Sequence, residues 1–224
     1  MKAFARRNGL SLFFLSIFLL ALGLQSLAGW QDFNNDQLRH QGDAIGYGRY
    51  LLSSEFGVAM LENWQSEYLQ FALYIAATIW FLQQGSPESK QLDKAGTESE
   101  REQKIGRHAD RRSPAWARVG GARTWLYSNS LLLVMGAIWL LSWLGQSITG
   151  RVAYNAERIE HHQASMGYLD YLGSADFWER TLQNWQSEFL AVGSMAILAV
   201  YLRQRGSPES KPVGEAHDHT GVTG

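Results

Sequence analysis

A tandem duplication constrains this chain more than any other feature of its sequence. Residues 8–90 align with residues 129–211 without a gap, at a constant offset of 121, and 31 of the 83 aligned positions are identical. The longest shared segments are NWQSE, at residues 63–67 and 184–188, and GSPESK, at residues 85–90 and 206–211. Self-similarity of this kind indicates two copies of one structural unit, so we expect one fold to occur twice.

Each copy contains two apolar segments, and the first of each pair approaches the length of a bilayer span. Residues 10–28 and 131–148 carry no charged side chain, and a spanning helix needs about 20 apolar residues. The second segments, residues 68–82 and 189–202, are shorter and reach a full span only when counted from the tryptophan of NWQSE. The pattern predicts an all-α polytopic membrane protein with four transmembrane helices, arranged as two tandem two-helix repeats.

The same pattern predicts where the chain divides. The segment that joins the copies is polar and poor in large apolar residues, which is typical of mobile chain. We therefore expect a first two-helix membrane repeat at 1–90, a polar cytoplasmic linker at 91–124, a second repeat at 125–211 and a disordered tail at 212–224.

Helix start signals recur in both copies. Ser53 and Ser174 each precede an acidic residue and an apolar run, which is typical of an N-cap. The second helix of each copy is therefore expected to begin one residue later, outside the membrane. The preceding loops contain enough helix formers, at 31–41 and 152–163, for a short surface helix of their own. The glycine of GSPESK is expected to cap each second helix at its far end.

Charge distribution predicts the orientation. The N-terminus, the linker and the tail together carry fifteen lysines and arginines, whereas the two loops at 30–62 and 150–183 carry five. Positively charged loops remain in the cytoplasm, so both termini are expected there. One alternative concerns the first segment alone, because Lys2, Arg6 and Arg7 before an apolar run, with Ser26-Leu27-Ala28 after it, also resemble a cleavable signal peptide.

The polar residues around NWQSE form the candidate site, because they precede the most apolar part of each second segment. Helical spacing places them on one face. A carboxylate that faces hydrocarbon is costly, so Glu67 and Glu188 are expected to face protein or water. The candidate residues on these helices are Asn63, Ser66, Glu67, Gln70, Asn184, Ser187 and Glu188.

Gln25 and Gln146 complete the candidate site. Each lies four residues before the glycine at which the first helix of its copy is expected to leave the membrane, at a depth similar to that of Glu67 or Glu188. We therefore predict a Gln–Glu hydrogen bond within each copy, which holds the outer ends of its two helices together. Interhelical hydrogen bonds in membranes are worth only about 0.6 kcal/mol on average.

Three functions for the polar site stay open at this point. The polar residues can be wet interfacial residues that start and pair helices. They can instead line a cavity open to the outside, where two neighbouring carboxylates, one with a raised pKa, carry a proton or cation. They can also bind another membrane protein. The protein is accordingly expected to be non-enzymatic, with a structural or accessory role, and the alternative is a small proton- or cation-linked channel or carrier that uses Glu67 and Glu188.

Other features narrow the range of partners. The partners expected are the lipid bilayer and either a second copy of the chain or another membrane protein. Net charge is −1, so nucleic acid is not expected as a partner. The chain has no cysteine, and no cofactor or metal site is expected. His40 and His161 recur in the outer loops and are weaker candidates for a pH-sensing or metal site.

These motifs also resemble those of a family of small bacterial integral membrane proteins with a domain of unknown function. The resemblance covers the chain apart from the linker and tail. It implies a bacterial cytoplasmic membrane protein and supplies no catalytic residue. The second copy departs from the motif at Gln183, Phe189 and Ala191. The segments that carry the resemblance are RNGLS at 7–11, QS at 25–26 with Gly29, GRY at 48–50, ENWQSEYLQ at 62–70 and GSPES at 85–89.

Overall fold

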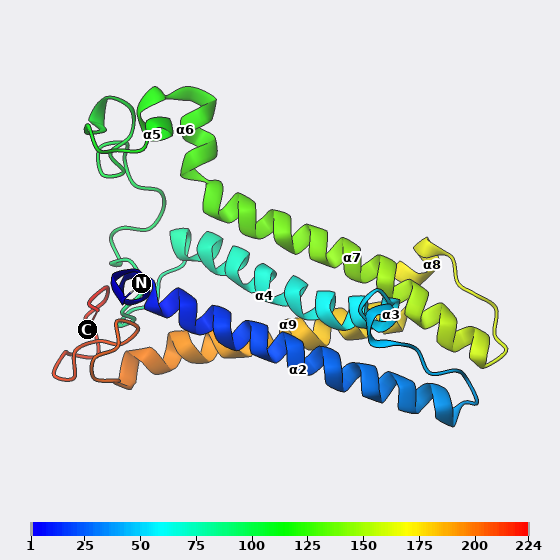
Figure 1. The fold of residues 1–224 in the computed structure, drawn as a ribbon. Coiled ribbons are helices and arrows are strands. Elements are labelled where there is room, and N and C mark those ends of the chain that lie inside the picture. The colour runs from blue at the N-terminus through cyan, green and yellow to red at the C-terminus, as the bar shows by residue number, and fades with distance from the viewer. Residues whose placement is uncertain (1, 224) are drawn as a thin grey trace. The chain divides into compact units, whose positions relative to one another are not determined.

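The computed structural model describes residues 2–223, and all regular structure in this range is helical (Figure 1). The predicted all-α class is therefore confirmed for the described residues. The helices are α1 Lys2–Arg7, α2 Gly9–Arg39, α3 Tyr47–Leu51, α4 Ser54–Trp80, the 3-10 helix η1 Gly106–His108, α5 Ala115–Val119, α6 Gly121–Ser128, α7 Ser130–Glu160, α8 Tyr168–Leu172 and α9 Ala175–Tyr201.

The helices of the second copy match those of the first in order and length. α2 and α7 each have 31 residues, α3 and α8 each have 5, and α4 and α9 each have 27. The short helix α5 lies in the segment that joins the copies. The helix α6 corresponds in position to α1, and Asn129 Nδ2 donates to the carbonyl oxygen of Trp125 as Asn8 Nδ2 donates to that of Phe4.

The predicted starts of α4 and α9 are confirmed. Ser53 Oγ accepts a hydrogen bond from the backbone N–H of Phe56 at 3.3 Å. Ser174 Oγ accepts one from Phe177 at 3.3 Å. Each bond satisfies one of the N–H groups that a helix start leaves without an intrahelical partner.

The expected separate surface helices are wrong, because α2 and α7 continue unbroken to Arg39 and Glu160. A single glycine inside a helix costs only about 0.5–1 kcal/mol relative to alanine, so Gly29 and Gly150 do not end the helix. The chain turns later, at Gln41 and His162. These two residues lie in the left-handed region, with φ of 61° and 57°.

Two helices, α2 and α7, are long and apolar enough to cross a membrane. Among the described residues, α4 and α9 do not reach the same apolarity, since NWQSE lies in the first half of each. The structure therefore supports two candidate spans by length and composition, and a four-span arrangement remains a prediction.

The chain folds into two compact units, each of which draws on both copies of the repeat. Unit 1 comprises Met1–Met60 and Gly145–Tyr171, and unit 2 comprises Leu61–Leu144 and Leu172–Gly224. Unit 2 includes the tail, where Thr220 Oγ1 accepts a hydrogen bond from the Gly85 N–H at 2.9 Å. The boundaries of the units thus differ from those of the sequence repeats.

In the long helices, several polar side chains are buried and many large apolar side chains are exposed. Gln65, Gln146 and Thr181 are 0% exposed, whereas Leu20 on α2 is 64% exposed. Large apolar side chains normally fill the interior of a soluble domain. Small and polar side chains between helices, with apolar side chains outside, are typical of helices that pack in lipid.

Candidate functional site

In unit 1, the loop after each long helix folds back and is fastened to that helix by the same contacts in both copies. The hydroxyl groups of Ser26 on α2 and Tyr47 on α3 lie 2.6 Å apart. The equivalent hydroxyls of Ser147 on α7 and Tyr168 on α8 lie 2.7 Å apart. We call each of these arrangements a loop clasp, made of a serine, a glycine and an asparagine on the long helix and two tyrosines on the short helix.

The asparagine of each clasp fixes the backbone of the loop. Asn34 Nδ2 donates to the carbonyl oxygen of Ile45 at 3.0 Å, and the Ile45 N–H donates to Asn34 Oδ1 at 2.8 Å. Asn155 makes the same pair of bonds with Met166, at 3.0 and 2.7 Å. A side-chain amide that pairs with both backbone groups of one residue satisfies them as a neighbouring strand would.

The glycine of each clasp makes room for the second tyrosine. A Cβ on Gly29 would overlap the hydroxyl of Tyr50, and a Cβ on Gly150 would overlap that of Tyr171. Both tyrosines are buried, at 5% and 0% exposed. Burial, followed by the nearby charges of Glu55 and Asp32, raises the pKa of Tyr50. These contacts give a structural reason for the recurring Gln-Ser, Gly and Tyr positions.

In unit 2, a polar contact zone joins α4 to α9 around the NWQSE segments. Arg180 Nη1 on α9 lies 3.7 Å from Glu62 Oε2 on α4. Arg180 Nε is also paired with Asp176 Oδ1 at 3.1 Å. The ion pair between Glu62 and Arg180 has no equivalent pair in the repeat, because Glu62 corresponds to Gln183 and Arg180 corresponds to Ala59 in the other copy. Glu62 and Arg180 were not among the predicted site residues, although both lie at positions where the two copies differ.

The buried Gln65 and the half-buried Trp185 form the centre of this zone. Trp185 Nε1 donates to Gln65 Oε1 at 2.8 Å, and Gln65 Nε2 donates to the carbonyl oxygen of Glu62 at 3.0 Å. The indole N–H of Trp185 thus satisfies a glutamine that is 0% exposed.

Among the predicted residues, the structure brings Ser66 and Glu188 together. Ser66 Oγ donates to the carbonyl oxygen of Asn63 at 2.8 Å and lies 3.5 Å from Glu188 Oε1, the long end of the hydrogen-bond range. Glu188 also interacts electrostatically with Glu67. Ser66 is buried and Glu67 is exposed. Acids of the two copies are thus close enough to influence each other.

The remaining predicted residues on α4 and α9 face away from this contact or bond within their own helix. Asn63 is exposed and Gln70 is half-buried. Asn184 Nδ2 donates to the carbonyl oxygen of Arg180 at 2.8 Å, and Ser187 Oγ donates to that of Asn184 at 2.9 Å. The face of α4 that packs on α9 is therefore one residue removed from the predicted one, with Gln65 at its centre.

Gln25 and Gln146 belong to unit 1, whereas Glu67 and Glu188 belong to unit 2. Gln25 is exposed and Gln146 is completely buried. The predicted Gln–Glu hydrogen bonds stay a prediction. His40 and His161 are both exposed, and His40 Nδ1 lies 3.5 Å from Asp36 in its own helix.

An aromatic cluster in unit 2 surrounds Trp143 and was not foreseen. The Trp143 ring lies 5.8–6.3 Å from those of Phe177, Trp178 and Trp185, and 6.0 Å from that of Trp139. In the first copy, Trp143 and Trp178 are replaced by Leu22 and Gly57. The cluster is therefore specific to the second copy and adds apolar packing around the polar zone.

The GSPESK segments form two similar turns after α4 and α9. Gly85 and Gly206 have φ of 83° and 85°, and Ser89 Oγ and Ser210 Oγ accept from the N–H groups of Gln83 and Gln204 at 3.0 and 2.9 Å. The helices end earlier, at Trp80 and Tyr201. The glycines therefore form the following turn and are not the expected helix caps.

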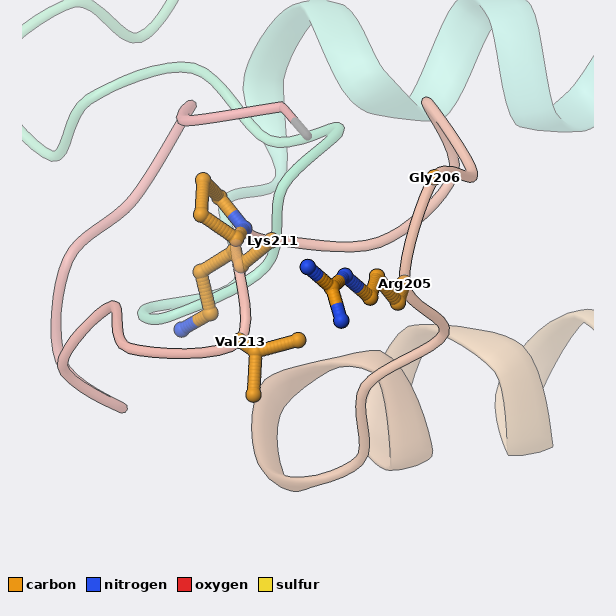
Figure 2. A pocket seen from close by; sticks show the side chains of 5 residues that line it. Arg205, Gly206, Lys211 and Val213 are labelled. Atoms are coloured by element: carbon orange, nitrogen blue, oxygen red, sulfur yellow. The ribbon is translucent and has the colours of Figure 1, made fainter.

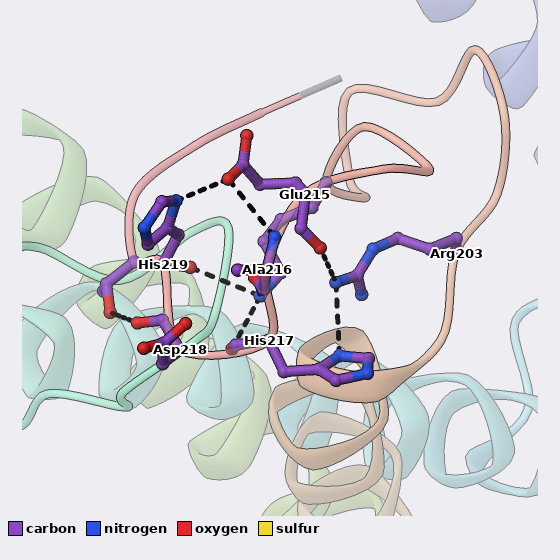
Figure 3. Close-up of polar contacts among 8 residues, drawn as sticks. Arg203, Glu215, Ala216, His217, Asp218 and His219 are labelled. Carbon is purple, nitrogen blue, oxygen red and sulfur yellow. Dashed lines mark hydrogen bonds and ion pairs between the residues drawn. The ribbon is translucent and has the colours of Figure 1, made fainter.

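Lys211, at the end of the second turn, holds the tail. It is 1% exposed, and its Nζ donates to the carbonyl oxygens of Ala216, His217 and His219 at 3.0, 2.8 and 3.3 Å. Burial and, secondly, the charge of Arg203 lower its pKa. Arg203 itself donates to the carbonyl oxygen of Glu215 and contacts the His217 ring (Figure 3).

The same turn lines a small pocket of about 520 Å³ (Figure 2). Its lining residues are Arg205, Gly206, Lys211, Pro212 and Val213. The ammonium group of Lys211 is committed to the tail carbonyls, so Arg205 supplies the charge at this pocket.

The two turns also bring equivalent carboxyl groups together. Glu88 and Glu209 share a hydrogen bond, and the Tyr74 hydroxyl donates to Glu88. The hydrogen bond from Glu209, and secondarily that from Tyr74, lower the pKa of Glu88. The hydrogen bond to Glu88 and its charge raise the pKa of Glu209. The pKa values of these corresponding residues are thus shifted in opposite directions, as expected of two carboxyl groups that share one proton.

Within the described chain, no group of three or more histidine, aspartate or glutamate side chains comes together as a metal site would require. The site is thus defined by helix-to-helix and loop-to-helix contacts in an all-helical protein with two candidate membrane spans. The chain belongs to the family described as "Domain of unknown function (DUF6766)", which matches residues 1–222. Neither a curated protein nor a solved structure matches the chain.

The family match confirms the expectation of a family without an assigned activity. The bacterial origin and the membrane setting that the resemblance implied stay predictions.

Proposed function

We propose that the chain is a four-span integral membrane protein of the bacterial inner membrane, with a non-enzymatic structural or accessory role. The observation that supports the proposal is that polar side chains of α4 and α9 contact one another. In unit 2, Gln65, Ser66 and Arg180 each bond to a residue of the other copy. Polar groups that are satisfied in this way stabilise helix pairing.

The apolar outer surface supports the membrane setting. Phe13 and Leu20 on α2 are 59% and 64% exposed, and Leu141 on α7 is 68% exposed. Large apolar side chains that are exposed to this extent on a long helix favour contact with lipid or with another protein. Lipid covers such a surface, and another membrane protein or a second copy of the chain can cover part of it.

The length of α4 and α9 supports their assignment as the other two spans. A helix of 27 residues is about 40 Å long, and a bilayer core is about 30 Å thick. The acidic first turns then lie outside the bilayer, and NWQSE lies near the interface. The fifteen basic residues of the N-terminus, linker and tail support a cytoplasmic position for both termini under the positive-inside rule.

In-cell cross-linking of the tagged full chain tests the accessory role. We expect a homodimer or a membrane-protein partner at fixed stoichiometry, and the same complex with Glu67→Gln and Glu188→Gln. A chain that stays monomeric and unaccompanied under conditions that cross-link a known membrane complex contradicts this role.

A proton- or cation-linked carrier is the second candidate. The contact between Ser66 and Glu188, together with the electrostatic interaction of Glu188 with Glu67, favours it, because neighbouring carboxylates can share a proton or a cation. Proteoliposomes provide the test. A carrier predicts pH-dependent flux that is lost in Glu67→Gln and Glu188→Gln but kept in the control Glu179→Gln, on the exposed side of α9.

Labelling of Glu67→Cys and Glu188→Cys in whole cells with an impermeant maleimide adds a direct measure of water access. Fast labelling of both is expected of a carrier open to the outside. Slow labelling with intact folding favours acids that pack against helices.

A further inference from the structure

Unit 1 contains a pocket on the first loop clasp that is separate from the NWQSE zone. Its volume is about 690 Å³, which is within the range of small-molecule sites, about 300–1,000 Å³. We call it the loop pocket. The residues that line it are Phe33, Gln37, Asp43, Ile45, Gly48, Arg49, Leu52 and Ser53.

The loop pocket carries one charge of each sign. Asp43 and Arg49 both line it, and neither side chain forms a hydrogen bond or ion pair with any other described residue. The carboxylate and the guanidinium are therefore both available to a ligand. A guanidinium presents paired donors to an acidic group, and a carboxylate accepts from an ammonium group.

The clasp holds the apolar wall of the pocket in place. Ile45 is fixed through its backbone by Asn34, and its carbonyl oxygen also accepts from Trp30 Nε1 at 2.7 Å. Phe33 packs on the buried Tyr50, with ring centroids 5.9 Å apart. A wall that is ordered before the ligand arrives lowers the entropy cost of binding.

In the second copy, an arginine side chain fills the space that corresponds to the loop pocket. Gln37 corresponds to Arg158, whose Nε donates to the carbonyl oxygen of Ala164 at 2.8 Å and whose guanidinium lies 5.7 Å from the centre of the Tyr154 ring. Tyr154 and Ala164 correspond to Phe33 and Asp43. The arginine therefore bridges the positions between which the first copy has a pocket.

The charges differ between the copies as well. Asp43 and Arg49 are replaced by Ala164 and Asp170, and Gly48 is replaced by Leu169. The second copy thus keeps the clasp, with the same serine, asparagine and tyrosine contacts, but not the paired charges. The clasp alone does not require Asp43 or Arg49.

We propose that the loop pocket binds a small zwitterion. Its ammonium group pairs with Asp43, its acidic group pairs with Arg49, and its apolar part lies on Phe33, Ile45 and Leu52. A free apolar amino acid and the headgroup of phosphatidylethanolamine share this chemistry. The proposal is independent of the accessory or carrier role, because it rests on a different unit of the protein.

The test uses the full-length chain purified in a non-ionic detergent and two probes. Calorimetric titration with L-leucine tests the free amino acid, and native mass spectrometry with phosphatidylethanolamine, against phosphatidylglycerol, tests the lipid. We expect one probe to bind, which identifies the source. Loss of one charge-assisted contact in Asp43→Asn or Arg49→Ala should weaken binding about tenfold or more.

Two further variants make the test specific. Gln37→Arg copies the residue that fills the second copy, so it should fold normally and abolish binding. Asp170→Asn, at the position that corresponds to Arg49, should leave binding unchanged. Thermal unfolding of each variant checks that it is folded. The proposal is overturned if neither probe binds the wild-type chain, or if folded Asp43→Asn, Arg49→Ala and Gln37→Arg bind as the wild type does.

Discussion

The hydroxyls of Ser26 and Tyr47 lie 2.6 Å apart, and the corresponding hydroxyls of Ser147 and Tyr168 lie 2.7 Å apart. Ser26 Oγ also donates to the carbonyl oxygen of Gly23 at 2.8 Å, so Tyr47 is the donor in the first pair. The same bond at the same place in both copies fixes the return of the chain from the first long helix of each copy to the second.

Removing the tyrosine hydroxyl should weaken each clasp. We expect Tyr47→Phe and Tyr168→Phe each to lower the free energy of unfolding by about 0.5–1.5 kcal/mol, the net value of one hydrogen bond. Thermal and denaturant unfolding in detergent measures the change. Tyr127→Phe, at an exposed position, is the control and should have no effect. Equal stability of all three variants would show that the clasp bond contributes nothing.

Alanine at the clasp glycines should destabilise the protein, although alanine usually stabilises a helix. A Cβ at Gly29 would collide with the Tyr50 hydroxyl, whereas a Cβ at Gly23 meets nothing within 4 Å. Gly23→Ala should therefore raise the free energy of unfolding by roughly 0.5–1 kcal/mol, and Gly29→Ala should lower it.

Tyr50→Phe removes the atom with which the new Cβ collides, so it should restore part of the stability lost in Gly29→Ala. Unfolding of the single and double variants measures this coupling. If Gly29→Ala is as stable as Gly23→Ala, the close packing of Tyr50 on α2 is wrong.

The ion pair between Glu62 and Arg180 should couple α4 to α9 weakly. The side chains are 21% and 39% exposed, and their nearest atoms are 3.7 Å apart. Arg180 is also paired more closely with Asp176, so the attraction to Glu62 is weak. A double-mutant cycle with Glu62→Gln and Arg180→Gln should give a coupling free energy of about 0.2–1 kcal/mol. The same cycle with Glu179→Gln in place of Glu62→Gln should give no coupling free energy. A coupling of equal size in that control cycle would show that Glu62 has no specific role.

The shared proton of Glu88 and Glu209 predicts how stability depends on pH. The pKa of Glu209 is raised above its ordinary value of 4.5, so the folded state binds more protons than the unfolded state between these two values. The stability from Glu209 is therefore complete below pH 4.5 and is lost as the pH rises through its folded-state pKa.

Glu209→Gln cannot titrate and keeps a hydrogen-bond donor, so it should remove this loss and flatten the stability profile above the ordinary pKa of glutamate. Unfolding temperatures across the acidic and neutral range measure the effect, with Glu100→Gln in the exposed linker as the control. A profile for Glu209→Gln that matches the wild type would show that the two carboxyls do not share a proton.

Much of the architecture could be predicted from the sequence, because it follows from local signals. The starts of α4 and α9 were recognisable from Ser53 and Ser174, since an N-cap acts within one helical turn. The helical class followed from the apolar segments. The extent of α2 was not predicted, because one glycine weakens a helix without ending it.

The candidate site was predicted less well, because it depends on contacts between segments far apart in the chain. Helical spacing placed Ser66 and Glu188 on the polar faces of their helices, and the structure brings these two residues together where α4 contacts α9. Helical spacing could not show that Gln65 and Trp185 form the centre of the contact between α4 and α9, since Trp is also common at a membrane interface. Nor could the repeat alone show the pair of Glu62 and Arg180, which exists where the two copies differ.

Cysteine accessibility tests the proposed topology most directly, since the chain has no native cysteine. Ala44→Cys and Ser165→Cys lie at corresponding exposed loop positions, and Thr97→Cys and Thr223→Cys are exposed in the linker and tail. With an impermeant maleimide, Ala44→Cys and Ser165→Cys should be labelled in intact cells, and the other two only after lysis. Labelling of Thr97→Cys or Thr223→Cys in intact cells, or of only one of the two loops, would contradict four spans with both termini in the cytoplasm.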